Sequence, residues 1–279
     1  MSEQAHGAPF EPLFLPAANG ERFCIYHPPA AARRGGVVYL HPFAEEMNKS
    51  RRMAALQSRM LAARGFAVLQ IDLFGCGDSS GNFGDASWEI WQHDVALAVQ
   101  WLRQRVGGSV ALWGLRLGAL LALDSARLCD PAPDRFVLWQ PVISGESFVT
   151  QFLRLRVATD MIAEGAAQTS TKDLRNELST GGVLEIAGYD LTRKLTNAID
   201  GLKLAELAPR DATVHWFEVV ADANGSLSPA SRRVADAWIA RGVEANIHAV
   251  AGEPFWNTIE ITECPALLAE TTRVVAEAL

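Results

Sequence analysis

The sequence has no apolar stretch long enough to span a membrane, which takes about 18 residues without charge. Its first residues, Met1 to Gly7, also lack the basic segment followed by an apolar segment that marks a secretory leader. From these two absences we expect a protein of the cytoplasm that does not insert into a membrane.

Cysteine and basic residues are both scarce. The four cysteines are widely separated and form no C-x-x-C pair and no zinc-type spacing with histidine (Cys24, Cys76, Cys129 and Cys264). In a reducing compartment they are expected to be free thiols, and we expect no metal and no cofactor. The chain has 25 basic and 32 acidic residues, and the resulting net charge of -7 disfavours nucleic acid and anionic membranes as partners.

Apolar residues, in contrast, make up 49% of the chain, enough for a sizeable core. Short apolar runs alternate with amphipathic helical patterns, which indicates a mostly parallel sheet with helices on both faces. Helices are predicted at 51–64, 88–105 and 265–278, and a charged loop at 41–50. The eight predicted strands, which include an N-terminal hairpin with an Asn-Gly turn, are 10–15, 22–27, 37–40, 66–71, 109–113, 136–139, 214–220 and 245–250.

This alternation breaks between residues 143 and 212. The segment of about 70 residues contains helical patterns and no convincing strand. It is too long for a simple connection, because loops in α/β units usually take about 2–6 residues. We interpret it as a helical lid, or cap, over the carboxyl ends of the strands, inserted into a core formed by 1–142 and 213–279.

The most informative stretch runs from Ser109 to Leu123. A strand-like apolar run ends at Gly114, the polar residue Arg116 follows, and a helical pattern continues after Gly118. This spacing matches the G-x-S-x-G nucleophile elbow, in which a strained turn presents a catalytic serine. Arginine stands in place of the serine here, and a protonated guanidinium cannot attack a carbonyl.

Taken together, three motifs resemble the α/β-hydrolase superfamily from end to end of the chain: Leu40-His41-Pro42, the glycine-rich stretch 72–81, and the elbow. More narrowly, the segments 40–52, 70–81 and 151–156 resemble the family called exosortase A system-associated hydrolase 2. The resemblance implies the α/β-hydrolase fold and hydrolysis of ester or thioester bonds. It also implies bacteria that pair exopolysaccharide production with exosortase-dependent sorting of PEP-CTERM proteins.

The other two positions of the catalytic triad also depart from the superfamily pattern, in which the nucleophile is followed by an acid and then a histidine. The acid position holds Asn224, with Asp222 as the alternative if the register shifts by two residues. The histidine position falls near Pro254, and no histidine follows His248. His41 lies near the site, but in this superfamily such a residue usually supports the oxyanion loop. Without a base a nucleophile stays weak, so we predict a degenerate triad.

Two functions remain open at this point. In the first, the chain does not hydrolyse. It binds an anionic, acyl or glycan small molecule, or a partner protein, in the former active-site cleft. The binding groups would be the Arg116 fork, the backbone N–H groups of Phe43 and Leu117, and the side chains of His41, Glu46 and Asp222. In the second, the chain hydrolyses an ester or thioester of an acylated envelope or polysaccharide intermediate with non-standard catalytic residues.

A simpler interpretation of Arg116 is an internal ion pair with Glu45, Glu46 or Asp222 that fills the vacated pocket. The predicted lid also carries an apolar face, for which a lid contact and a homodimer contact are equally good explanations (Phe148, Phe152, Leu153 and Leu155). Trp139 and Trp256, at strand ends, are candidates for lining a pocket, and Cys76 is expected to be structural.

Overall fold

The sheet has eight strands in the order β1-β2-β4-β3-β5-β6-β9-β10. This computed structural model describes residues 10–164, 169–222 and 225–278. β2 pairs antiparallel with β1 and with β4, and all other neighbours in the sheet are parallel. The predicted eight-stranded, mostly parallel sheet is therefore confirmed. The strands are β1 (Glu11–Ala17), β2 (Gly20–His27), β3 (Gly35–Leu40), β4 (Phe66–Ile71), β5 (Val110–Leu115), β6 (Arg135–Trp139), β9 (Thr213–Val220) and β10 (Glu244–Ala251).

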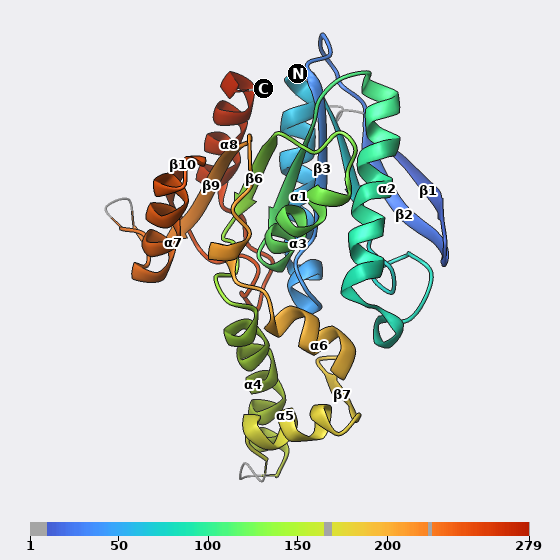
Figure 1. Cartoon of the computed structure of the whole chain (residues 1–279), viewed down its shortest axis with the longest axis vertical. Helices are drawn as coiled ribbons and strands as arrows, with labels where there is room; N and C mark the ends of the chain where they lie inside the picture. The colour runs from blue at the N-terminus through green and yellow to red at the C-terminus, as the bar shows by residue number, and fades with distance from the viewer. Residues whose placement is uncertain (1–9, 165–168, 223–224, 279) are drawn as a thin grey trace, which may run out of the picture.

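Helices cover both faces of the sheet (Figure 1). α2 (Trp88–Val106), α3 (Leu117–Ser125) and α7 (Pro229–Ala240) pack on one face, and α1 (Glu45–Ala63) and α8 (Pro265–Ala278) on the other. Each face has its own cluster of buried apolar side chains, as expected when strands are apolar on both sides. Short 3-10 turns occupy η1 (Phe83–Asp85) and η2 (Ala126–Leu128). None of the helices in the described ranges is long and apolar enough to cross a membrane.

The segment 143–212 lies beyond one end of the sheet, where Figure 1 shows α4, α5, α6 and β7 grouped together. It contains α4 (Gly145–Glu164), α5 (Thr171–Ser179), β7 (Val183–Ile186), β8 (Tyr189–Thr192), α6 (Arg193–Asp200) and η3 (Leu204–Glu206). The expectation that this segment holds no strand was wrong, because β7 and β8 form an antiparallel hairpin. The turn residues Ala187 and Gly188 both have positive φ, 52° and 83°, which suits a two-residue hairpin turn.

α1 begins at Glu45, six residues before the predicted start, so the expected loop at 41–50 is largely helical. The residue that caps it, Ala44, has φ of 51° and makes no side-chain capping bond, so the usual capping signal is missing from the sequence. Glu45 and Glu46 instead occupy the first turn, where negative charge is favourable next to the helix N-terminus. This start places Glu46 above the elbow.

The elbow is packed backbone to backbone against the end of β3. A Cβ atom added to Gly118 would lie 2.4 Å from the carbonyl oxygen of Leu40 and 2.6 Å from that of His41. A Cβ on Gly114 would lie 2.4 Å from the carbonyl oxygen of Gly118. All three distances are shorter than a carbon–oxygen contact allows, so the two glycines of the motif are required by the close approach of α3 to β3 and β5.

We expect Gly118→Ala to destabilise the protein by about 3 kcal/mol, because its methyl group collides with main-chain atoms that cannot rotate away. The matched control is Gly108→Ala, whose added Cβ meets no atom within 4 Å. Urea denaturation of both variants checks this expectation. Equal stability of the two variants would show that the close packing at the elbow is not a constraint.

Candidate functional site

Arg116 occupies the apex of the turn between β5 and α3. Its backbone has φ of 56° and ψ of -118°, a conformation that L-residues seldom adopt. Three backbone bonds hold it: its N–H donates to the carbonyl of Trp139 at 2.9 Å, and its carbonyl accepts from the N–H groups of Ala119 at 3.1 Å and Val142 at 3.4 Å. The strained turn of a nucleophile elbow is therefore present, with a guanidinium in place of a hydroxyl at its apex.

The guanidinium of Arg116 pairs with Glu46. Its Nε and Nη2 atoms both donate to Oε1 of Glu46, each at 3.2 Å. The side chains are 17% and 13% exposed, so solvent screens this pair weakly. Of the three ion-pair partners that the sequence left open, the structure selects Glu46. Aromatic rings flank the pair, with the guanidinium carbon 5.9 Å from the ring of Phe148 and 5.5 Å from that of Trp256.

This ion pair leaves hydrogen-bonding capacity unused. One carboxylate oxygen of Glu46 takes both guanidinium bonds, whereas a fork-to-fork pair would use two oxygens. Within the described part of the chain, the buried Oε2 atoms of Glu46 and of Glu45 have no hydrogen-bond partner. Buried polar atoms are usually satisfied, so each of these oxygens is a position where a ligand, a proton or a water could add a bond.

Burial raises the pKa of Glu46 to about 7. The positive charge of Arg116 opposes this rise, and the negative charge of Glu45 adds to it. Burial likewise raises the pKa of Glu45. At neutral pH the Glu46 carboxyl group is therefore close to its midpoint, and small changes around it alter its charge.

A cavity of about 310 Å³ opens above the ion pair. α4 forms its roof, and the loop after β10 forms one wall through Trp256 and Asn257. Apolar rings and polar groups both reach into it; the residues that line it are Phe43, Glu45, Glu46, Arg116, Phe148, Gln151, Phe152, Arg154, Leu155, Trp256 and Asn257. Phe148, Phe152 and Leu155, whose role was open between lid and dimer contact, thus line a cavity within the chain.

Two backbone N–H groups near the elbow, those of Phe43 and Leu117, were predicted as donors to a ligand. Neither donates a hydrogen bond to any residue in the described ranges. The ring of Phe43 is held by edge contacts with Phe148 at 5.7 Å and Phe152 at 5.1 Å, which anchor α4 over the elbow. Both N–H groups therefore remain available within the described ranges, and their role as donors to an oxyanion or another ligand stays a prediction.

Comparison with known proteins identifies the family. Residues 31–180, more than half of the chain, match the family described as "Serine aminopeptidase, S33". The chain belongs to this family of α/β-hydrolases. Human protein ABHD12B is 34% identical over 116 residues, which cover 40% of this chain and 30% of that protein. The chain therefore matches less than a third of the length of this relative.

Solved structures of other α/β-hydrolases share the fold of this family member. Est1E from Butyrivibrio proteoclasticus, solved with ferulic acid bound, has a TM-score of 0.67 and 13% identity, covering 95% of this chain and 96% of its own. A thermostable carboxyl esterase from Bacillus coagulans has a TM-score of 0.64 and 15% identity, covering 96% and 97%. Mouse α/β-hydrolase domain-containing protein 10 has a TM-score of 0.60 and 15% identity, covering 96% and 100%.

Of the positions predicted for the acid and the histidine of the triad, the structure of this S33 member describes Asp222 and Pro254. Asn224 lies outside the described residues. Asp222 is exposed after β9, and Pro254 is exposed in the loop after β10; neither lines the cavity. The loop that would carry the histidine of a hydrolase contributes Trp256 to the cavity instead. In the described ranges no histidine lines the cavity.

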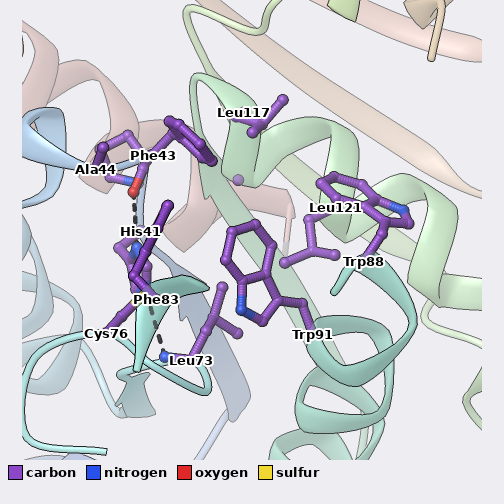
Figure 2. Close-up of a pocket in the computed structure, with 12 residues that line it drawn as sticks. His41, Phe43, Ala44, Leu73, Cys76, Phe83, Trp88, Trp91, Leu117 and Leu121 are labelled. Atoms are coloured by element: carbon purple, nitrogen blue, oxygen red, sulfur yellow. Dashed lines mark hydrogen bonds between the residues drawn. The ribbon is translucent and has the colours of Figure 1, made fainter. Parts of the chain in front are cut away.

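His41 supports the loop beneath the elbow (Figure 2). Its Nδ1 lies 2.7 Å from the carbonyl of Pro42 and donates to it, and its Nε2 accepts from the N–H of Leu73 at 3.2 Å. Burial lowers the pKa of His41, which keeps the ring neutral and suits this pair of bonds. Both ring nitrogens are therefore used by the backbone. Contact of His41 with a ligand stays a prediction.

One side of His41 faces apolar residues, and the charged side chains of Arg51 and Asp72 lie near it on another. Figure 2 shows Phe43, Phe83, Trp91 and Leu117 around a small cavity that His41 also lines. The volume of this cavity is about 10 Å³, roughly the room of one water. Cys76 lines it, and burial raises the pKa of its thiol, so it remains an inert thiol as expected. All four cysteines are buried and free. Trp139 is buried, its indole nitrogen donates to Thr271, and it lines neither of these two cavities.

Three polar residues of the cavity were missed by sequence reasoning as site residues: Gln151, Arg154 and Asn257. Gln151 and Arg154 belong to the segment 151–156 that carries the family resemblance, and this was the one available signal for them. Nothing in the sequence marks Asn257, which reaches the cavity through the path of the loop after β10.

Glu46 makes a sharp prediction for the pH dependence of stability. The pKa of Glu46 is 4.5 as a free side chain and about 7 in the folded protein, so the folded state holds the proton more tightly than the unfolded chain does. The stability that this proton adds to the folded state is fully present below about pH 4.5 and is lost as pH rises through 7. Glu46→Gln has no such proton to lose. The free energy of unfolding of this variant should therefore gain on the order of 3 kcal/mol over wild type between about pH 4.5 and pH 8.

Urea denaturation at several pH values measures this gain, and the exposed Glu177→Gln is the matched control. The control should follow the wild-type curve throughout. If the free energy of unfolding of Glu46→Gln changed with pH in the same way as that of wild type, Glu46 would have the same pKa in the folded protein as in the unfolded chain.

Proposed function

We propose that this α/β-hydrolase family member does not hydrolyse and instead binds a small anionic amphiphile in the cavity under α4. The observation that supports this is the guanidinium of Arg116 at the apex of the elbow, facing a cavity that no histidine in the described ranges lines. Hydrolysis by this fold needs a nucleophile and a base at hydrogen-bonding distance. An arginine at that position supplies a cation, which suits recognition of a carboxylate or phosphate.

The cavity offers separate surroundings for the two ends of such a ligand. In this proposal Arg116 is the main donor for an anionic head group, and the backbone N–H groups of Phe43 and Leu117 complete a cluster of donors. Arg116 and Phe43 line this cavity, and Leu117 lines the smaller cavity next to Phe43. The rings of Phe148 and Trp256 border this cluster and would contact an apolar body. The volume of about 310 Å³ lies at the lower end of small-molecule sites, so a compact acyl chain or an aromatic acid fits better than a polymer.

The alternative, an ester or thioester hydrolase, predicts a measurable activity. With purified protein and a panel of activated esters and thioesters, we expect turnover no higher than that of Arg116→Ala, because Arg116 is no nucleophile and no histidine in the described ranges lines the cavity. A serine-directed phosphonate probe should leave the protein unlabelled. Turnover well above the variant, or stoichiometric labelling, would establish the hydrolase function instead.

The matched control for this assay is Arg116→Ser, which places a serine at the elbow apex. It should also be inactive, since His41 uses both ring nitrogens for backbone bonds. If Arg116→Ser hydrolyses esters efficiently, a base acts in this cavity, and the triad lacks only its nucleophile.

We further propose that this protein serves an exosortase-linked exopolysaccharide system from the cytoplasm. The segments 40–52, 70–81 and 151–156 support this by their family resemblance, and the last of them supplies Gln151 and Arg154 to the cavity. Deletion of the gene should reduce exopolysaccharide or missort exosortase substrates. Complementation by wild type but not by Arg116→Ala is expected, because the proposed binding depends on the guanidinium. A deletion strain with normal polysaccharide and normal sorting would contradict this context.

A further inference from the structure

Glu46 and an anionic ligand compete for the same atoms of Arg116. The Nε and Nη2 atoms of the guanidinium are the pair that would hold a carboxylate by two parallel bonds, and Oε1 of Glu46 takes both at 3.2 Å. A ligand carboxylate that replaced Glu46 would also lie beside the negative charge of Glu46, whose side chain is mostly buried. Two carboxylates at such a distance cannot both stay ionised without a large cost.

We propose that Glu46 is a proton-operated latch on Arg116. Ionised Glu46 occupies the guanidinium, and when Glu46 takes up one proton from solvent, an anionic ligand binds the guanidinium in its place. The proton goes to a carboxylate oxygen of Glu46, and the ligand carboxylate takes the bonds from Nε and Nη2. The net charge of the cavity is the same before and after binding, because one anion replaces another. The free oxygen Oε2 of Glu46, which has no partner within the described ranges, is available to receive the proton or to donate it onward in a hydrogen bond.

The charged groups around Glu46 favour this exchange. On α1, Glu45 repels its negative charge and Lys49 attracts it. From the elbow, Arg116 attracts it most strongly, and from α4 the side chain of Arg154 lines the same cavity. The loop after β10 contributes the uncharged Trp256 and Asn257. Burial outweighs the attraction, and the pKa of Glu46 rises to about 7, so the proton is available near neutral pH.

The latch has a thermodynamic signature. Above the pKa of Glu46, each anion that binds must bring one proton with it, so affinity falls about tenfold for each unit of rising pH. Below that pKa the carboxyl group is already neutral, and affinity no longer depends on pH. This inference rests on the proposed function, because it describes how the same cavity admits its ligand.

Calorimetric titration with octanoate between about pH 6 and pH 8.5 tests the latch. The expected result for wild type is an affinity that is constant near pH 6 and falls about tenfold per unit above pH 7.5. Titrations in buffers of different ionisation enthalpy should count close to one proton taken up per octanoate at pH 8.5. Glu46→Gln should bind octanoate with an affinity that does not change with pH and should take up no proton.

Glu45→Gln is the matched control on the neighbouring residue. The affinity of this variant for octanoate should still fall about tenfold per pH unit, but the fall should begin at a lower pH. The reason is that the negative charge of Glu45 helps to hold the pKa of Glu46 high, and the substitution removes that charge. Octanamide, the neutral analogue, should bind wild type with no dependence on pH.

The outcomes separate the latch from the proposed function. If octanoate binds wild type and Glu46→Gln with the same affinity at every pH, the latch is wrong and the binding function stands. If octanoate binds neither protein at any pH, the proposed function fails and the latch fails with it.

Discussion

The close approach of Gly118 to the carbonyl groups of Leu40 and His41 is the constraint on which the site depends. It brings α3 against β3 and forces the turn before it into the strained conformation of Arg116. Because the backbone determines where the apex side chain points, the elbow presents whichever residue stands there to the cavity under α4. The scaffold of a hydrolase is therefore retained, although its apex residue has changed.

Arginine at the apex changes the charge at the elbow, because it places a permanent cation where a serine nucleophile would be neutral. A serine nucleophile needs a base and leaves the oxyanion donors to stabilise a developing charge. Arg116 instead adds a permanent positive charge beside these donors. A mostly buried cation of this kind needs an anion next to it. Glu46 fills this need from the first turn of α1 at the cost of burying its own carboxylate. The resulting pair is held together by charge and remains open to competition by a ligand of the same charge.

Much of this could be predicted from the sequence, because long apolar runs and the elbow spacing are strong local signals. The eight strands, α2 and α8 were predicted within a few residues. The start of α1 was missed because Ala44 lacks a capping side chain. The hairpin of β7 and β8 was missed because four-residue strands are too short for a clear alternation.

The site was less predictable than the fold, because its contacts join distant segments. Arg116 was identified from its position in the motif, whereas its partner stayed open among three acidic residues until the distances selected Glu46. His41 was placed near the site, but the backbone bonds that occupy its ring depend on Leu73 from another strand end. Trp256 and Asn257 reach the cavity through the path of a loop that no local pattern determines.

The central claim is that the guanidinium of Arg116 is the group that receives an anion. The most direct measurement is the ¹⁵N–¹H NMR signal of Arg116 Nε, assigned by its loss in Arg116→Lys and followed during addition of octanoate near pH 6. The account predicts a saturable shift of this signal with the same affinity that calorimetry reports. A signal that stays unchanged while octanoate binds would place the ligand elsewhere and contradict the account.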